Sequence, residues 1–203
     1  MREMLNYDDT YRLALLTSDP MSFIEKRWGD SKPYYQQFIA PLADRYTNLN
    51  TMEIGSGFGR YTKHIVPNTK LMYAIDPSLI CRKFLSEQFK DIIVLHPDKI
   101  NHIPNNSIDL AFSFSTMLHF NKDEMLFYLK HIGTKLKSGG HFVLHYMNPT
   151  SSKSLLSSSR YVFYEETQLT DLSKPFGLSK IKSEIPQKAI IPGHTVMTLR
   201  KQK

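Results

Sequence analysis

The stretch from Thr51 to Arg60 limits what this chain can fold into more than any other part of the sequence. A short apolar run ends in the acidic residue Glu53, three glycines follow at every second position, and a later apolar run ends in Asp76. Glycine has no Cβ, so its backbone can adopt positive φ and approach a ligand closely. This pattern predicts a strand, a glycine turn, a helix that begins near Gly59, and a second strand with a carboxylate at its tip. Ligands of open α/β sheets bind outside the carboxyl ends of such strands.

The spacing of the glycines separates two kinds of nucleotide site. A dinucleotide fingerprint needs G-x-G-x-x-G, and its third glycine would fall at position 60, which is Arg60. The observed pattern is E-x-G-x-G-x-G, with Glu53 inside the motif. It resembles the first motif of class I S-adenosylmethionine-dependent methyltransferases. The glycines alone would also suit a purely structural turn between a strand and a helix.

Further segments match that family in the same order along the chain. Asp76-Pro77 matches the place of an acid that binds the ribose hydroxyls, and Asp98 that of an acid that accepts from the adenine amino group. Residues 108–113 resemble the fourth strand, whose end faces the transferred methyl, and residues 136–144 resemble the entry to the fifth strand. The resemblance implies that S-adenosylmethionine binds at Glu53, Gly55, Ser56, Gly57, Gly59, Asp76, Pro77, Asp98 and Ser113, and leaves as S-adenosylhomocysteine.

Strand and helix patterns alternate along the chain, which predicts an α/β fold. Strands are expected at residues 50–54, 70–76, 91–96, 108–114, 140–147, 178–185 and 195–200, and helices at 59–66, 78–89, 122–137 and 165–172. The resemblance covers about residues 35–202 and implies a seven-stranded, mostly parallel, doubly wound Rossmann-like sheet. Residues 1–48 are rich in aromatic residues and broken by prolines. They are expected to form short helices, a lid or extension before a cofactor-binding domain at 49–203.

Two histidines are candidates for a base that takes a proton from the acceptor. Transfer to an oxygen needs such a base. His119 lies in Met117-Leu118-His119-Phe120, which resembles the V-L-H-H-L run that often follows the fourth strand of the family. His145, near the end of the fifth strand, is the second candidate. His119 could equally cap a helix or pack against it.

Acceptor specificity is expected from parts outside the common sheet. Tyr34, Tyr35, Tyr146 and Tyr164 could line an acceptor pocket, or simply pack helices onto the sheet. The serine-rich residues 151–159 predict a loop or flap. The favoured function is O-methylation of a small molecule such as a sugar or sugar nucleotide. A methyltransferase of protein or RNA, and a catalytically silent cofactor-binding module, remain alternatives. The N-P-P-Y signature of amino-group methylation is absent after the fourth strand, which weakens nucleobase acceptors.

Composition sets the outer limits of these functions. The 203 residues carry a net charge of +7, and residues 101–203 hold 13 Lys and Arg against 7 Asp and Glu, which suits an anionic substrate group. The basic residues are scattered, which disfavours a nucleic-acid partner. No long apolar run or signal peptide is expected, and the single Cys81 fits a reducing cytoplasm. No ligand cluster for a metal is recognised.

Overall fold

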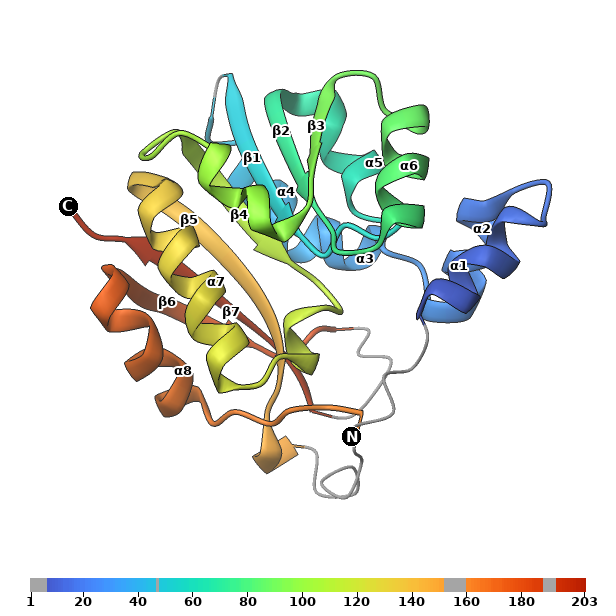
Figure 1. Ribbon diagram of the computed structural model, residues 1–203. Coiled ribbons are helices and arrows are strands. Elements are labelled where there is room, and N and C mark those ends of the chain that lie inside the picture. Colours follow the sequence, from blue (N-terminus) through green and yellow to red (C-terminus); the bar gives the residue numbers. More distant parts are fainter. Residues whose placement is uncertain (1–6, 47, 152–159, 188–192) are drawn as a thin grey trace.

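A seven-stranded sheet in the order β3-β2-β1-β4-β5-β7-β6 forms the centre of the protein (Figure 1). The computed structural model describes residues 7–46, 48–151, 160–187 and 193–203. The strands are β1 (Leu49–Ile54), β2 (Thr69–Ile75), β3 (Ile92–Leu95), β4 (Ile108–Ser113), β5 (Leu136–Met147), β6 (Leu178–Glu184) and β7 (His194–Lys201). The first five pair in parallel, and β7 runs antiparallel to both of its neighbours. The predicted α/β fold with a seven-stranded, mostly parallel sheet is confirmed.

Helices cover both faces of this sheet. The α-helices are α1 (Tyr7–Leu15), α2 (Pro20–Trp28), α3 (Lys32–Tyr34), α4 (Ala40–Ala43), α5 (Thr62–Ile65), α6 (Leu79–Gln88), α7 (Lys122–Lys135) and α8 (Glu166–Ser173). A π-helical turn, η1 (Tyr35–Ile39), joins α3 to α4. The described 3₁₀ turns are η2 (Val66–Asn68), η3 (Pro97–His102), η4 (Met117–His119), η5 (Pro149–Ser151) and η7 (Lys174–Phe176). Helices α7 and α8 lie on one face, and α3 and α4 lie behind the sheet in Figure 1.

Two apolar clusters, one on each face, hold the sheet between its helices. Met125 and Leu129 of α7 and Leu169 of α8 pack with Ile54 and Leu144 on one face. The other face packs against the amino-terminal helices through Tyr34, Phe38, Ile39, Leu42 and Ala43. Since these five residues are all buried, helices α3 and α4 belong to the main core rather than to a separate lid.

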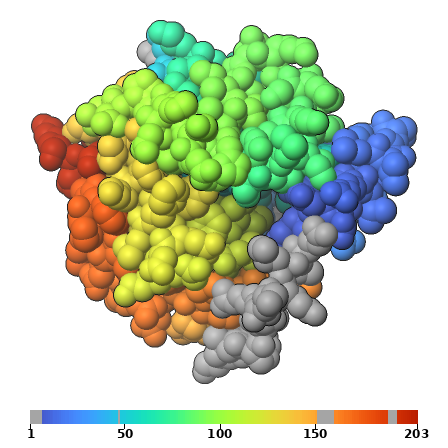
Figure 2. Space-filling view, viewed as in Figure 1, coloured from blue at the N-terminus to red at the C-terminus, as the bar shows by residue number. Residues whose placement is uncertain are grey.

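Helices α1 and α2 form a hairpin that packs elsewhere. Ala14 and Ile24 are fully buried against Phe58, next to the glycine turn, and against Phe84 of α6. The side chain of Asp19 caps α2 by accepting from the backbone N–H of Ser22 at 3.0 Å. Figure 2 shows this amino-terminal segment, in blue, lying against the surface of α6. Tyr7 and Asp8, at the start of α1, thereby reach His119 and Ser78 at the carboxyl end of the sheet.

Two predicted boundaries are wrong. The helix expected from residue 59 begins only at Thr62 and lasts four residues, because Gly59 adopts φ +85° and the 3₁₀ turn Val66–Asn68, which contains Pro67, follows directly. A helix this short offers no strong dipole to a ligand. Strand β5 begins at Leu136 rather than at residue 140, since Leu136 pairs with Ile108 across a register shift. The serine-rich segment falls mainly on residues 152–159, outside the described residues.

Candidate active site

The glycine turn follows β1, which pairs with β4 at the point where the strand order of the sheet reverses. Open α/β sheets bind ligands in the crevice at such a point. Gly55 and Gly57 adopt φ +73° and +54°. A Cβ at Gly55 would lie 2.1 Å from the hydroxyl oxygen of Thr116, which follows β4. The Thr116 hydroxyl donates to the carbonyl of Gly55 at 3.2 Å. Glycine is therefore required at position 55 both for its conformation and for the close approach of the two loops.

Asp76 lies at the tip of β2 and faces this turn. One carboxylate oxygen accepts from the backbone N–H of Gly57 at 2.8 Å, and the other accepts from that of Ser78 at 2.9 Å. Burial raises the pKa of Asp76, and these two amide bonds oppose the shift. A carboxylate has about four lone-pair sites, so two remain for hydroxyl donors. These two remaining acceptor positions would fit the two hydroxyls of a ribose, and that role of Asp76 stays a prediction.

Glu53 is the most strongly perturbed acid of the site. It is buried beneath the glycine turn and accepts from the Thr62 hydroxyl at 2.5 Å. Burial, opposed by the hydrogen bond from Thr62 and aided by the nearby Asp76, raises the pKa of Glu53 to about 8. The carboxyl group is therefore mostly protonated at neutral pH in the ligand-free protein. A cation bound above the turn would favour its ionised form.

Helix α1 covers the glycine turn from outside. A Cβ at Gly57 would lie 2.5 Å from the hydroxyl oxygen of Tyr11, whose ring packs 4.6 Å from that of Phe58. One turn earlier, Asp8 accepts from the Ser78 hydroxyl at 2.6 Å. The buried Arg60 connects the end of α2 to the glycine turn, because its guanidinium donates to the carbonyls of Trp28 and Gly29. A ligand bound at the glycine turn would therefore lie next to Tyr11 and Asp8 of α1.

His119 lies at the end of η4, and its two nitrogens have fixed roles. Nδ1 lies 2.7 Å from the carbonyl oxygen of Arg160, which can only accept, so Nδ1 carries the proton. Nε2 therefore holds the lone pair and accepts from the Tyr7 hydroxyl at 2.9 Å. Burial lowers the pKa of His119, so the ring is neutral near pH 7. This geometry leaves His119 able to take a proton through Nε2, and Tyr7 is its present partner.

His145 is held in the opposite tautomer. The backbone N–H of Ser115, just past β4, donates to Nδ1 of His145 at 3.1 Å. Because burial holds its pKa well below the usual range, the ring is neutral and its proton is on Nε2. In this arrangement neither nitrogen has a free lone pair, so His145 can donate a hydrogen bond more readily than it can take a proton. The ring of His194 lies 4.5 Å away, edge to face.

The remaining predicted cofactor residues lie around the same crevice but have other bonds. The Ser113 hydroxyl is buried and donates to the carbonyl of Ile54 at 3.0 Å. The Ser56 hydroxyl donates to the carbonyl of Glu53. The carbonyl of Pro77 accepts from the Arg82 guanidinium at 2.6 Å. The Asp98 side chain is 81% exposed and lies 3.2 Å from His96, so it is accessible to a ligand beyond β3.

The four predicted acceptor tyrosines do not form one site. Tyr34 is buried beside His145, and Tyr35 stacks on His64 with ring centroids 5.2 Å apart. Tyr146 lies in the cluster under α7 and α8, on the other face of the sheet, because it follows His145 directly in a strand. Tyr164 belongs to the same cluster and donates to the carbonyl of Phe120 at 3.1 Å. Tyr34 and Tyr35 are thus separated from the other two.

The sequence interpretation missed three residues of this region. Tyr7 and Tyr11 reach His119 and Gly57, and their spacing of four places them on one helix face, which the sequence could have revealed. His194 meets His145 only because β7 pairs antiparallel with β5, with Met147 opposite His194. No local sequence signal marks that contact.

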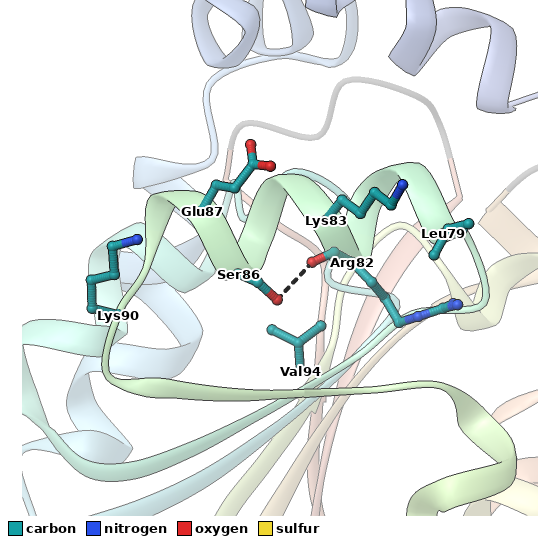
Figure 3. A pocket seen from close by; sticks show the side chains of 7 residues that line it. All are labelled: Leu79, Arg82, Lys83, Ser86, Glu87, Lys90 and Val94. Carbon is teal, nitrogen blue, oxygen red and sulfur yellow. Dashed lines mark hydrogen bonds between the residues drawn. The ribbon is translucent and has the colours of Figure 1, made fainter.

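The groove shown in Figure 3 lies outside this site. It has a volume of about 390 Å³ and runs along α6 toward edge strand β3, lined by Leu79, Arg82, Lys83, Ser86, Glu87, Lys90 and Val94. None of these is a predicted cofactor or acceptor residue. In the parts of the chain that the structure describes, no group of three or more His, Cys, Asp or Glu could hold a metal ion. Within the same ranges, none of the helices has the length and apolarity that crossing a membrane requires.

Comparisons with known proteins agree with this geometry. A family model described as a methyltransferase domain matches residues 27–181. An uncharacterized methyltransferase of Anoxybacillus flavithermus is 23% identical over 120 residues, which are 59% of this chain and 56% of that relative. The chain therefore spans little more than half the length of that protein.

Solved structures share the fold at low identity. An S-adenosylmethionine-dependent methyltransferase of Clostridium acetobutylicum superposes with a TM-score of 0.70 at 14% identity, over 86% of this chain and 93% of the other. A chain from the complex between the Haloferax volcanii Trm112 methyltransferase activator and its methyltransferase also gives 0.70, at 13% identity, over 96% and 98% of the two chains. Both likenesses concern the fold alone.

Proposed function

This chain belongs to the methyltransferase domain family, and on that premise we propose that it is an S-adenosylmethionine-dependent methyltransferase that methylates a hydroxyl oxygen of a small molecule. Sugars and sugar nucleotides are the favoured acceptors. The observation that carries the proposal is the Tyr7 hydroxyl, which donates to Nε2 of His119 at 2.9 Å. It joins the covering helix α1 to a neutral base just past β4.

The residues around the glycine turn support cofactor binding. Asp76 would accept from the ribose hydroxyls through its remaining lone pairs, and Asp98 is exposed for the adenine amino group. Glu53 would orient the methionine part from beneath the turn. When bound, S-adenosylmethionine supplies a methyl group on a sulfonium, which is already a good leaving group. The protein then mainly has to align acceptor and methyl, which can contribute on the order of 7–11 kcal/mol.

The proton of the acceptor hydroxyl is the second task of the site. His119 is neutral, and the carbonyl of Arg160 keeps its lone pair on Nε2. An acceptor hydroxyl in place of the Tyr7 hydroxyl would meet that lone pair directly. A positioned base of this kind contributes typically 10²–10⁴-fold to the rate.

The coverage of the turn favours a small acceptor over a macromolecule. Tyr11 and Asp8 of α1 lie on Gly57 and Ser78, so a large substrate could not approach the turn directly past α1. The likeness to the chain solved with a methyltransferase activator keeps a protein or RNA acceptor, and a partner protein, as a second candidate. A silent cofactor-binding module would bind the cofactor without turnover.

One experiment separates these three functions. The full chain is incubated with S-adenosylmethionine labelled on its methyl group, together with a cell extract divided by size into small molecules and macromolecules. Label in the small-molecule fraction supports the proposal, and label in protein or RNA supports the second candidate. Calorimetric binding of S-adenosylmethionine without any transfer would identify a silent module. An alkali-stable methyl ether in the product would identify oxygen as the acceptor atom.

A further inference from the structure

Another polar cluster lies at the carboxyl end of β5, which is two strands from β1 and its glycine turn in the sheet. His145 of β5 is 1% exposed and His194 of β7 is 7% exposed. Their rings meet edge to face at 4.5 Å. Ser115 adopts φ +58°, a rare conformation for a residue other than glycine. In this conformation the backbone N–H of Ser115 donates to Nδ1 of His145. Strained backbone of this kind is concentrated at functional sites.

Three ring nitrogens of this pair lack hydrogen bonds. Among residues 7–46, 48–151, 160–187 and 193–203, no group bonds to Nε2 of His145 or to either nitrogen of His194. An unpaired buried polar group destabilises a protein, and native structures have few of them. Unpaired groups of this kind indicate a bound partner. His145 offers one N–H donor, and neutral His194 offers one donor and one acceptor, so together they can bond to a hydroxyl group of a ligand.

A surface hollow and the surroundings of His145 share the residue Tyr34. A hollow of about 330 Å³ is lined by Pro33, Tyr34, Gln36, Gln37 and Gln187. The ring of Tyr34 forms part of this wall and lies 5.7 Å from the ring of His145. The hollow borders the π-helical turn η1, a feature frequently found at functional sites. Tyr34 thus separates the surface hollow from the buried nitrogens.

We infer that this hollow and the histidine pair behind Tyr34 form the part of the acceptor site that adjoins His119, and that they bind an uncharged, hydroxyl-rich molecule, a sugar rather than a sugar nucleotide; this rests on the proposed function. Of the described residues that line the hollow, none is charged. Burial lowers the pKa of His194 to about 4, so it is neutral near pH 7. The nearest buried cation on the motif, Arg60, is bonded to the carbonyls of Trp28 and Gly29. A phosphorylated acceptor would find no described cation in the hollow, whereas sugar hydroxyls would find amides, a phenol and imidazoles.

The first arm of the test needs no acceptor. Thermal unfolding compares the ligand-free protein with His194→Leu and with the control His141→Leu, also a buried histidine, whose Nδ1 is bonded to the Tyr46 hydroxyl at 2.8 Å. Removing unpaired nitrogens should raise Tm in His194→Leu by roughly 2–4 °C, and losing a made bond should lower it in His141→Leu. A fall in both variants would mean that the nitrogens of His194 already have partners, and the inference would be wrong.

The second arm uses methyl-labelled S-adenosylmethionine and the small-molecule extract of the expression host, divided by ion exchange into uncharged and anionic pools. Label should enter the uncharged pool, fall at least tenfold in His194→Leu, and recover in part in His194→Gln, while calorimetry shows unchanged cofactor affinity. Label confined to the anionic pool, or undiminished in His194→Leu, would overturn the inference. If no fraction is labelled although the cofactor binds, the proposed function fails, and the unfolding arm still decides whether the pair awaits a ligand.

Discussion

The hydroxyl oxygen of Tyr11 lies 2.5 Å from the point that a Cβ on Gly57 would occupy. The two residues belong to helix α1 and to the glycine turn, and they define how closely α1 approaches that turn. The Tyr11 ring carbon that bears the hydroxyl would be 3.4 Å from the same point, which is ordinary contact.

Gly57→Ala should therefore destabilise the protein by roughly 1–3 kcal/mol, because it adds a clash to a positive φ. Adding Tyr11→Phe should recover part of this loss, since it removes the clashing oxygen but not the backbone strain. A double-mutant cycle by urea unfolding measures the coupling, expected at about 0.5–3 kcal/mol. Strictly additive effects would show that α1 does not lie on the turn in solution.

Asp76→Ala should weaken binding of S-adenosylmethionine at least tenfold. Each hydrogen bond to a charged acceptor is worth roughly 1.5–3 kcal/mol, and two ribose hydroxyls would lose their partner. Asp91→Ala, an exposed acid just before β3, serves as the control and should bind normally. Titration calorimetry decides, with circular dichroism to verify the fold. Unchanged affinity in Asp76→Ala would place the ribose elsewhere.

His119→Ala should lower methyl transfer by about 10²–10⁴ with cofactor affinity nearly unchanged. The wild-type rate should fall only as the pH drops below the ordinary range of histidine, because burial lowers the pKa of His119 and the base is the neutral form. Tyr7→Phe removes the present partner of Nε2 and should have a smaller effect. A rate profile that is identical in wild type and His119→Ala would exclude His119 as the base.

Glu53→Gln should change how stability depends on pH. The pKa of Glu53 is raised from 4.5 to about 8 in the folded protein, so between these values the folded state holds a proton that the unfolded state has lost. The free energy of unfolding contributed by this group is therefore highest below pH 4.5 and falls as the pH rises toward about 8. The unfolding free energy of Glu53→Gln lacks this fall. The difference in unfolding free energy between the variant and the wild type should therefore shift in favour of the variant between pH 4.5 and about 8, by on the order of a few kcal/mol. If the Tm values of the two proteins changed in parallel with pH across this range, the raised pKa of Glu53 would be refuted.

The sequence predicts the sheet and the cofactor turn well because their signals are local. The run from Glu53 through the glycines to Asp76 specifies a strand, a turn and a strand tip within two dozen residues, and both acids lie where expected. The helix after the turn was overestimated because apolar spacing does not register the positive φ of Gly59.

The acceptor side is less predictable because it depends on distant pairings. His194 becomes a neighbour of His145 through the antiparallel register of β7 on β5. Simple alternation along a strand would have shown that His145 and Tyr146 face opposite sides of the sheet, so both could not line one pocket. The roles of Tyr34, Tyr35 and Tyr164 in acceptor binding remain predictions.

The order of synthesis adds a consequence for how the protein matures. Tyr7 is made 112 residues before His119, and Asp8 is made 70 residues before Ser78. Helix α1 is thus synthesised well before the residues that complete its contacts, and contacts of long sequence separation form slowly. Until the glycine turn and α6 have been synthesised, the aromatic face of this helix has its contacts with α2 but lacks those with Phe58 and Phe84, and incompletely covered apolar surface makes a nascent chain prone to aggregation.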